Sequence, residues 1–372
     1  MKKVCVITTT RAEYGLLRWT IEELFNDKDI QAQVIVSGTH MSEKFGMTVN
    51  QIEADGIPIS RKISYISDER SLLGIAVESA DFGKKIAKAL SDLNPDLVLI
   101  LGDRYELLPI CMAALIQNIP IAHIAGGEVT EGAIDDQVRN AVTMMASLHF
   151  PNSEEAAENI SRMRASYNNV FNVGEPGIEN YHRLALKTKE ELSDIYKLNP
   201  SKNWVLVTLH PETRISMKEN LQMATEMMNT LQSMTDVEII ISESNADYGG
   251  KQMNAYYHSL AEKYQNIHVF HSFGQINYLS IMKAAWCVVG NSSSGVIETP
   301  YLGVPTLNIG NRQKGRRLSS NVMQVLPNKE SISMGLKTLL KNAPYLPDNS
   351  FGDGKCSLHI VKHIKEFLYE NL

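Results

Sequence analysis

The sequence predicts an α/β protein built from two doubly wound domains that face each other across a cleft. Short runs rich in Val, Ile and Leu alternate along the chain with longer stretches of helical period, which is typical of parallel sheets covered by helices. The alternation restarts after the Gly/Pro-rich segment 174–177, and 372 residues are enough for two domains. We expect a first domain over 1–174, a second over 175–355 and a C-terminal helix over 356–372 that packs back on the first domain.

The first domain begins with a buried strand and continues as alternating strands and helices. Its strands are expected at 4–7, 34–36, 97–101, 119–124 and 170–173. Two apolar stripes of helical period lie between them, one formed by Leu17, Ile21, Leu24 and Phe25 and the other by Ile86, Ala87, Ala89 and Leu90. Nearly continuous apolar strands of this kind favour a parallel sheet that is buried on both faces.

The second domain repeats the same strand and helix plan. Its strands are expected at 204–209, 237–241, 267–270, 286–289 and 305–309. The chain then closes with an amphipathic helix whose apolar stripe is Ile360, Val361, Ile364, Phe367 and Leu368.

Composition excludes several classes of protein. The 36 basic and 42 acidic residues are interspersed and give a formal charge of −6, which argues against a nucleic-acid or anionic-membrane partner. The four cysteines, at positions 5, 111, 287 and 356, are far apart and form no CxxC pair, so we expect reduced thiols. The N-terminus turns polar after four apolar residues and lacks a signal-peptide core. We therefore expect a soluble, cytoplasmic protein.

Polar segments follow most of the expected strands. In doubly wound sheets ligands collect at the carboxyl ends of the strands, so functional residues are expected there. These segments are 8–14, 37–40, 102–104 and 126–128 in the first domain, and 210–213, 242–247, 271–274, 291–295 and 310–312 in the second.

The turn "GNSSSG", residues 290–295, predicts a phosphate site. Serines at the start of a helix offer hydroxyls, free backbone N–H groups and the positive end of the helix dipole, and we expect Ser292 and Ser293 to be the contacts. Glu298 lies roughly 8 Å farther along the helix, where a carboxylate can accept two hydrogen bonds from a ribose diol. Arg312 supplies a cation near the same sheet edge. The alternative is that Ser292 only caps the helix and Glu298 is a solvated surface acid.

The first domain carries candidate carboxylates instead of a phosphate loop. Asp103 directly follows an apolar strand and has Arg104 beside it, and Asp135 lies one helical turn before Arg139. Acids held near arginines at the mouth of a cleft suit proton transfer or the binding of substrate hydroxyls. The alternative for Asp135 and Arg139 is a plain ion pair.

The histidines give no metal signature. His40, His123, His210 and His271 lie in or after expected strands, where a single histidine is commonly a structural hydrogen-bonding group. Their spacings match no zinc motif such as HExxH, and we expect neither a metal nor another cofactor.

Nine segments together resemble the hydrolysing UDP-N-acetylglucosamine 2-epimerases of sialic-acid synthesis. They occur in order over nearly the whole chain, as "TTTRAEYG", "SGTHM", "GDRYE", "HIAGGE", "DDQVR", "TLHPET", "NADYGG", "GNSSSG" and "GNRQKGR". The resemblance implies a glycosyltransferase-B (GT-B) type fold with two Rossmann-like domains. It also implies that UDP lies mainly on the second domain.

The resemblance assigns roles to matching positions of this chain. It implies that the nucleotide-sugar site is lined by Arg11, His40, His210, Phe273, Ser292, Ser293, Glu298 and Arg312. It implies that the catalytic group is drawn from Asp103, Asp135, Glu128 and His210, with Arg104 and Arg139 orienting the carboxylates. The partners would be a UDP-sugar and UDP, and relatives form homodimers or homotetramers.

The implied reaction removes the C2 proton while UDP leaves from C1, and water then adds to the 2-acetamidoglucal to release N-acetylmannosamine. One position departs from the pattern, because Ala125 stands where some relatives have a glutamate; Asp103, Asp135, Glu128 or Glu131 would then carry the proton transfer. The substrate left open is a UDP-2,4-diacetamido-2,4,6-trideoxyhexose of legionaminic-acid synthesis. A non-hydrolysing epimerase, a glycosyltransferase and an inactive nucleotide-sugar binding protein are the remaining alternatives.

Overall fold

The chain forms two compact units. The structure is a computed structural model that describes residues 1–66, 71–129, 134–212, 215–244 and 250–370. The first unit comprises Met1–Asn180 with Gly352–Leu372, and the second comprises Tyr181–Phe351. The sequence had placed these boundaries after residues 174 and 355. Each unit contains one parallel sheet of six strands.

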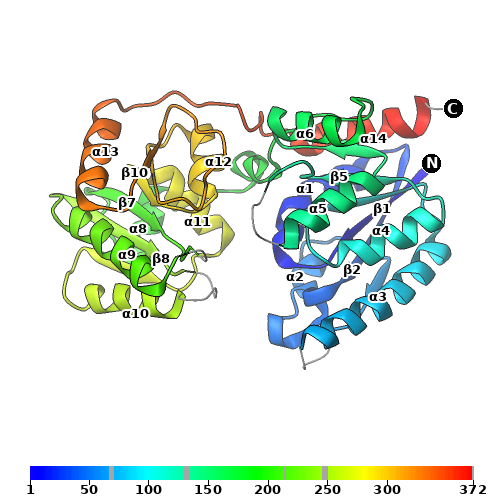
Figure 1. Ribbon diagram of the computed structural model, residues 1–372, viewed down its shortest axis with the longest axis horizontal. Coiled ribbons are helices and arrows are strands. Elements are labelled where there is room, and N and C mark those ends of the chain that lie inside the picture. Colours follow the sequence, from blue (N-terminus) through cyan, green and yellow to red (C-terminus); the bar gives the residue numbers. More distant parts are fainter. Residues whose placement is uncertain (67–70, 130–133, 213–214, 245–249, 371–372) are drawn as a thin grey trace. The chain divides into compact units, whose positions relative to one another are not determined.

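Unit 1 is a doubly wound sheet with the strand order β3-β2-β1-β4-β5-β6. Its strands β1, β2 and β5 are labelled in Figure 1. Its strands are β1 (Lys2–Thr8), β2 (Ile30–Ser37), β3 (Arg61–Ile63), β4 (Leu97–Leu101), β5 (Ile121–Ile124) and β6 (Leu148–Phe150). Its α-helices are α1 (Arg11–Asn26), α2 (Val49–Ala54), α3 (Leu72–Leu93), α4 (Leu107–Ile116), α5 (Ile134–Met145), α6 (Glu154–Arg164) and α14 (Cys356–Glu370). Short 3₁₀ segments lie at Gly38–Met41, Glu43–Phe45 and Pro176–Glu179.

Alternate residues of β1 enter two different cores, one on each face of the sheet. Val4 and Val6 pack with apolar residues of α1, α2 and α14, whereas Cys5 and Ile7 pack with those of α3, α4 and α5. Successive side chains of a strand point to opposite faces, so a strand covered on both faces must be apolar at every position. The expected assignment of parallel, doubly covered strands is confirmed.

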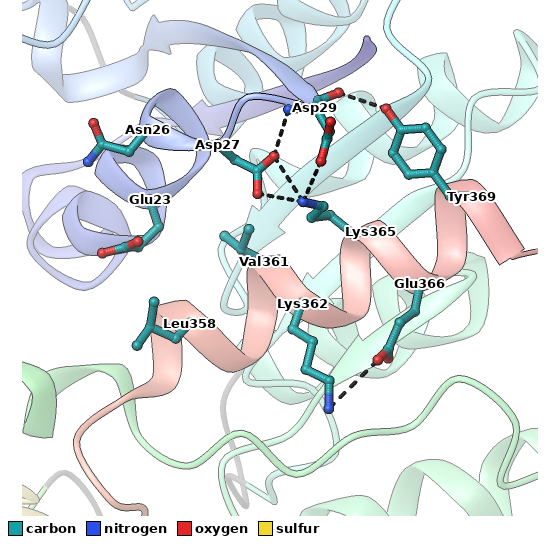
Figure 2. A pocket seen from close by; sticks show the side chains of 10 residues that line it. All are labelled: Glu23, Asn26, Asp27, Asp29, Leu358, Val361, Lys362, Lys365, Glu366 and Tyr369. Carbon is teal, nitrogen blue, oxygen red and sulfur yellow. Dashed lines mark hydrogen bonds and ion pairs between the residues drawn. The ribbon is translucent and has the colours of Figure 1, made fainter.

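The C-terminal helix α14 lies beside α1 in unit 1 (Figure 2). Its fully buried residues Ile360 and Ile364 join the core of that face. Lys365 donates hydrogen bonds to the carboxylates of Asp27 (2.9 and 3.2 Å) and Asp29 (2.8 Å). These contacts border an open pocket of about 710 Å³ at the end of the sheet where β1 and β2 begin.

Unit 2 has the strand order β12-β11-β10-β7-β8-β9, which is the order of unit 1 read from the other edge. Its strands are β7 (Asn203–Thr208), β8 (Val237–Ser242), β9 (Ile267–Phe270), β10 (Cys287–Gly290), β11 (Thr306–Ile309) and β12 (Val322–Val325). Its helices are α8 (Lys189–Tyr196), α9 (Met217–Gln232), α10 (Gly250–Ala261), α11 (Gly274–Ala284), α12 (Ser294–Leu302) and α13 (Lys329–Lys341), and α7 (Asn180–Arg183) spans the boundary between the units.

The two faces of this second sheet are also covered separately. Val205 and Val207 of β7 pack with residues of α9, α10 and α13, while Trp204 and Leu206 pack with residues of α8 and α11. The restart of the strand and helix plan after the Gly/Pro-rich segment therefore reflects a second sheet of the same topology.

Nine of the ten expected strands are present, and the prediction for 170–173 is wrong. Val170 makes only an isolated parallel bridge to His149, and the segment runs beside β6 without forming a named strand. Three short strands, β3, β6 and β12, were not expected. Edge strands such as β3 and β12 are partly exposed, so they lack the continuous apolar run by which buried strands are found in a sequence.

Candidate functional site

Both sheets reverse their strand order at a defined point. In unit 1 the reversal lies between β1 and β4, and in unit 2 between β7 and β10. Loops at the carboxyl ends of such neighbouring strands border the ligand crevice of a doubly wound sheet. Residues that bind a ligand are therefore expected after β1 and β4 in unit 1 and after β7 and β10 in unit 2.

The loops after β7 and β10 are joined through Asn291. The backbone N–H of His210 donates to Asn291 Oδ1 (2.7 Å), and Asn291 Nδ2 donates to the carbonyl oxygen of His210 (2.8 Å). Gly290 makes this approach possible, because a Cβ atom there would lie 2.1 Å from the carbonyl oxygen of Thr208. Two sequence-predicted segments thus meet at one point of unit 2.

The serine turn carries a connected set of hydroxyls. Ser292 Oγ lies 2.9 Å from Ser294 Oγ, which lies 2.7 Å from the Tyr278 hydroxyl, and that hydroxyl is 3.2 Å from Thr208 Oγ1. The N-cap residue of α12 is Ser293, and its side chain makes no capping hydrogen bond. Ser292 is thus not the N-cap residue, and its hydroxyl bonds to that of Ser294. The geometry leaves the helix N-terminus with hydroxyl groups and a positive dipole end.

Glu298 is half-buried on α12 and is not a solvated surface acid. The Tyr181 hydroxyl donates a hydrogen bond to Glu298 Oε2 (3.0 Å). Burial and the neighbouring Glu298 carboxylate raise the pKa of Tyr181 well above its usual value, so the phenol stays a donor. A carboxylate held in this way retains further lone pairs for other hydroxyl donors.

Arg312 is placed by contacts with two other loops of unit 2. Its guanidinium Nη1 donates to the carbonyl oxygen of Asn291 (3.2 Å), and its backbone N–H donates to Glu212 Oε1 (3.2 Å). The arginine therefore lies beside the serine turn, as the sequence analysis expected.

Phe273 occupies a different environment from the other predicted nucleotide contacts. Its side chain is buried in the core on the α8 and α11 face and packs against the rings of Tyr196 and Phe270. The ring itself therefore offers little surface to a ligand.

In unit 1 the predicted carboxylate Asp103 is paired with Arg139. The Arg139 guanidinium donates to Asp103 Oδ2 and lies 3.6 Å from Asp136 Oδ1, and its Nη1 donates to the carbonyl oxygen of Glu128 (2.8 Å). Arg139 thus pairs with Asp103 and Asp136, and the plain Asp135–Arg139 ion pair is not what α5 forms. The buried arginine fixes a half-buried carboxylate at the end of β4.

Asp135 lies close enough to Asp103 for the two acids to interact. Burial and the negative charge of Asp103 raise the pKa of Asp135 above its ordinary value. Two nearby carboxylates are an arrangement suited to proton transfer.

Arg104 lies between two buried glutamates. Its Nη2 donates to Glu106 Oε1 (2.8 Å), and its Nε lies 3.8 Å from Glu13 Oε1. Glu13 accepts hydrogen bonds from the backbone N–H (2.7 Å) and hydroxyl (3.0 Å) of Thr9. Burial raises the pKa of Glu13 to about 7, against the lowering effect of these hydrogen bonds. The loops after β1 and β4 are joined by this cluster.

Glu128 and Ala125 lie in the segment after β5. Asn152 Nδ2 donates to Glu128 Oε1 (2.7 Å), so this half-buried carboxylate is oriented by a neighbouring side chain. Ala125 has a left-handed backbone (φ 61°) and offers no ionisable group. Glu131, the other acid considered for this place, lies outside the described residues, as do Thr213 of "TLHPET" and 245–249, which cover most of "NADYGG".

The last two predicted residues of unit 1 differ in exposure. His40 is fully buried, with Nε2 3.0 Å from Thr8 Oγ1 and Nδ1 2.7 Å from Thr48 Oγ1. Burial lowers the pKa of His40 to about 4, so the ring is neutral near pH 7. Arg11 is exposed at the first residue of α1, at the carboxyl end of β1.

Several residues of these clusters were not predicted as site residues. Glu13, Glu106 and Asn291 lie inside quoted motifs, and their position close to a strand end was the available signal. Tyr181 and Tyr278 carry no such signal, because only the fold brings them to the predicted residues. In the described part of the chain no three His, Cys, Asp or Glu side chains are grouped to hold a metal ion, and no described helix is long and apolar enough to cross a membrane.

Comparisons with known proteins identify the family of the chain. The sequence model of the UDP-N-acetylglucosamine 2-epimerase family matches residues 22–365. A Campylobacter jejuni protein named GDP/UDP-N,N'-diacetylbacillosamine 2-epimerase (hydrolyzing) is 34% identical over 325 residues, covering 87% of this chain and 84% of that protein. The polysialic acid biosynthesis protein P7 of Escherichia coli is 32% identical over 383 residues, covering 99% and 95%.

The fold agrees with solved structures as well. The crystal structure of UDP-GlcNAc 2-epimerase from Neisseria meningitidis, bound to UDP-GlcNAc, superposes with a TM-score of 0.79 at 18% identity and covers 98% of this chain and all of that one. At this identity the structural likeness shows only the fold, which is the two-domain GT-B type. The family match over 22–365 and the relative named as a hydrolysing 2-epimerase at 34% identity show that the chain belongs to the hydrolysing UDP-N-acetylglucosamine 2-epimerase family.

Proposed function

We propose that the protein is a hydrolysing 2-epimerase that acts on a UDP-linked 2-acetamido sugar. The observation that carries the proposal is the serine turn at the end of β10, whose hydroxyls, helix N-terminus and neighbouring Glu298 combine a diphosphate site with a ribose acceptor in one unit. Family membership supplies the reaction type.

Unit 2 would hold the nucleotide. Ser292 and Ser293 would bind the diphosphate at the helix N-terminus, and Arg312 would add a positive charge as negative charge develops on the leaving group. Glu298 would accept hydrogen bonds from the ribose. Arg11 and His210 complete the residues expected to line the nucleotide-sugar site.

Unit 1 would supply the proton transfers. A carboxylate takes the C2 proton while the C1–O bond to UDP breaks, which leaves a C1=C2 double bond in a 2-acetamidoglucal. Water then adds its hydroxyl to C1, and a proton reaches C2 from the other face, so the free sugar has inverted C2. Asp103, held by Arg139, and Asp135, whose pKa is raised by burial and by Asp103, are suited to these roles. Glu128 is the third candidate.

Two sugars are proposed as substrates. The Campylobacter relative at 34% identity is named for N,N'-diacetylbacillosamine, which favours a UDP-2,4-diacetamido-2,4,6-trideoxyhexose. The Escherichia coli relative at 32% is named for polysialic acid biosynthesis, which favours UDP-N-acetylglucosamine and release of N-acetylmannosamine. Both substrates carry the 2-acetamido group and UDP that the proposed chemistry uses.

Incubation with each UDP-sugar in D₂O tests the proposal. We expect UDP and a free sugar that has inverted C2 and carries one deuterium there, with faster turnover of the diacetamido sugar. A product that keeps UDP attached would identify a non-hydrolysing epimerase. Binding of UDP without turnover of either sugar would contradict the proposed reaction.

We also propose that the chain forms a homodimer through the outer face of the α3, α4 and α5 layer of unit 1 (Figure 1). Helix α4 has no charged residue, and a helix that is apolar all round is normally buried. All three helices carry exposed apolar side chains, which are Leu73, Val77, Leu108, Met112, Leu115, Ile116 and Met144. Their exposed area is on the order of 700 Å², close to the ~800 Å² per partner of a stable interface.

Measurement of mass in solution tests this face. We expect the wild type to be dimeric and the double variant Met112→Glu, Ile116→Lys to be monomeric and folded. Leu346→Lys is a matched control, because Leu346 is equally apolar and 86% exposed in unit 2, and it should stay dimeric. A monomeric wild type, or a double variant that remains dimeric, would exclude this interface.

A further inference from the structure

We propose that two buried asparagines, Asn291 and Asn220, are positioning residues of the nucleotide site. They hold the loop after β7 from two sides and thereby place His210 and Arg312 beside the serine turn. The inference rests on the proposed function and adds to it the residues that assemble the site.

Asn291 uses its whole amide group on one residue. Its Oδ1 accepts from the His210 N–H (2.7 Å) and its Nδ2 donates to the His210 carbonyl oxygen (2.8 Å). The two hydrogen bonds use both the N–H and the carbonyl oxygen of His210, as a neighbouring strand in a sheet would. They fix the backbone of His210. The side chain is 1% exposed, so water does not compete for these bonds.

The backbone of Asn291 holds a third loop. Its carbonyl oxygen accepts from Arg312 Nη1 (3.2 Å) and from Gln313 Nε2 (2.9 Å). Gln313 is itself buried. One residue therefore joins the loops that follow β7, β10 and β11.

Asn220, from α9, repeats the reciprocal bond two residues farther along the β7 loop. Its Oδ1 accepts from the Glu212 N–H (2.8 Å) and its Nδ2 donates to the Glu212 carbonyl oxygen (3.0 Å). The Glu212 carboxylate then accepts from the backbone N–H groups of Asn311 (2.6 Å) and Arg312 (3.2 Å). Arg312 is thus linked to both asparagines, at its guanidinium and at its backbone.

The chemistry requires an amide at these positions. Each asparagine must donate and accept at once, which an aspartate cannot do because its ionised carboxylate only accepts. Removing the side chain takes away both hydrogen bonds that hold a part-buried backbone N–H and carbonyl. The loop would then relax, and His210 and Arg312 would lose their fixed places.

The test compares Asn291→Ala and Asn220→Ala with Asn321→Ala. Asn321 is also 1% exposed in unit 2, and its Nδ2 donates to the Val304 carbonyl oxygen (2.7 Å), at the amino end of the sheet. All three variants should lose stability alike. UDP affinity, measured by calorimetry well below the melting temperature, should fall at least tenfold in the first two and stay within twofold of wild type in Asn321→Ala.

A second readout follows the His210 ring by NMR during a pH titration. We expect the chemical shift and titration of the His210 ring to change in Asn291→Ala. In Asn291→Asp the chemical shift of this ring should lie between the values of Asn291→Ala and of the wild type. Unchanged UDP affinity and an unchanged His210 signal in Asn291→Ala would overturn the inference while the proposed function stands. A wild type that binds no UDP would overturn both.

Discussion

The position of the Asp103 carboxylate is fixed by Arg139. The Arg139 side chain is buried, donates to Asp103 and lies near Asp136, so two carboxylates share one guanidinium. Asp103 follows β4 at the point where the strand order reverses, whereas Asp136 lies in the first turn of α5. The two acids therefore share Arg139 as a partner, but only Asp103 lies at the strand end where a ligand is expected.

This difference gives the first prediction. Asp103→Asn should lower kcat by about 10²–10⁴-fold, the usual contribution of a general acid or base, while UDP binds with unchanged affinity. Asp136→Asn keeps the same arginine and should lower kcat less than tenfold. Near-normal turnover of Asp103→Asn would remove this residue from the mechanism.

Glu13 is the buried acid nearest the loop after β1. Burial raises its pKa from 4.5 to about 7, so the folded state binds its proton more tightly than the unfolded state does. Its effect on stability is therefore unfavourable where it is ionised, and stability declines as the pH rises from 4.5 to 7. A pKa raised from 4.5 to about 7 corresponds to about 3 kcal/mol.

Glu13→Gln should remove this decline. The free energy of unfolding of the variant, relative to wild type, should rise by up to about 3 kcal/mol between pH 4.5 and pH 8, as measured by urea denaturation at each pH. A difference between the two proteins that does not vary with pH would show that Glu13 titrates normally.

At the scale of elements, α14 is held to unit 1 by two kinds of contact. Ile364 is fully buried in the core of the α1 face, and its neighbour Lys365 makes ion pairs with Asp27 and Asp29. The ion pairs raise the pKa of Lys365 to about 12, yet they lie at the edge of an open pocket (Figure 2). Exposed pairs are screened by water and contribute little, whereas buried methyl groups contribute strongly.

Substitution of adjacent residues separates these contributions. Ile364→Ala should lower the free energy of unfolding by about 2–5 kcal/mol, and Lys365→Met should change it far less. Hydrogen exchange of α14 amides should accelerate in the first variant only. Equal destabilisation by both substitutions would mean that the ion pairs anchor the helix.

At the scale of the whole molecule, the buried histidines among the described residues are His40, His123 and His149, and all three are in unit 1. Burial lowers the pKa of His40 and His123 to about 4 and that of His149 to about 3. The folded state therefore resists protonation that the unfolded state accepts near pH 6.5. The stability that these three histidines contribute is complete above pH 6.5 and is lost as the pH falls toward 4. Between pH 4.5 and 6.5 Glu13 has the opposite effect on stability, but it is one group against three.

Unit 1 should consequently unfold before unit 2 on acidification. Of the chain's three tryptophans, Trp19 lies in unit 1, while Trp204 and Trp286 lie in unit 2. The fluorescence of a Trp204→Phe, Trp286→Phe variant should change at a higher pH than that of Trp19→Phe. Coincident transitions would contradict the assignment of the acid sensitivity to unit 1.

The doubly wound plan could be predicted from the sequence, because buried parallel strands must be apolar at every position and the helices between them must carry a stripe of period 3.6. The sequence also located the polar strand ends, and hence Asp103, Ser292 and Arg312, since the carboxyl ends of the strands in one parallel sheet lie along the same edge.

The hydrogen-bond and ion-pair partners of these residues could be identified only from the tertiary fold. The bonds from Asn291 to His210, from Arg139 to Asp103 and from Tyr181 to Glu298 join positions far apart in the chain. The local pattern around Arg139 suggested Asp135, one turn away, whereas the fold brought Asp103 from another loop. Hydrogen bonding and burial depend on which strands become neighbours in the sheet, and local periodicity does not specify that order.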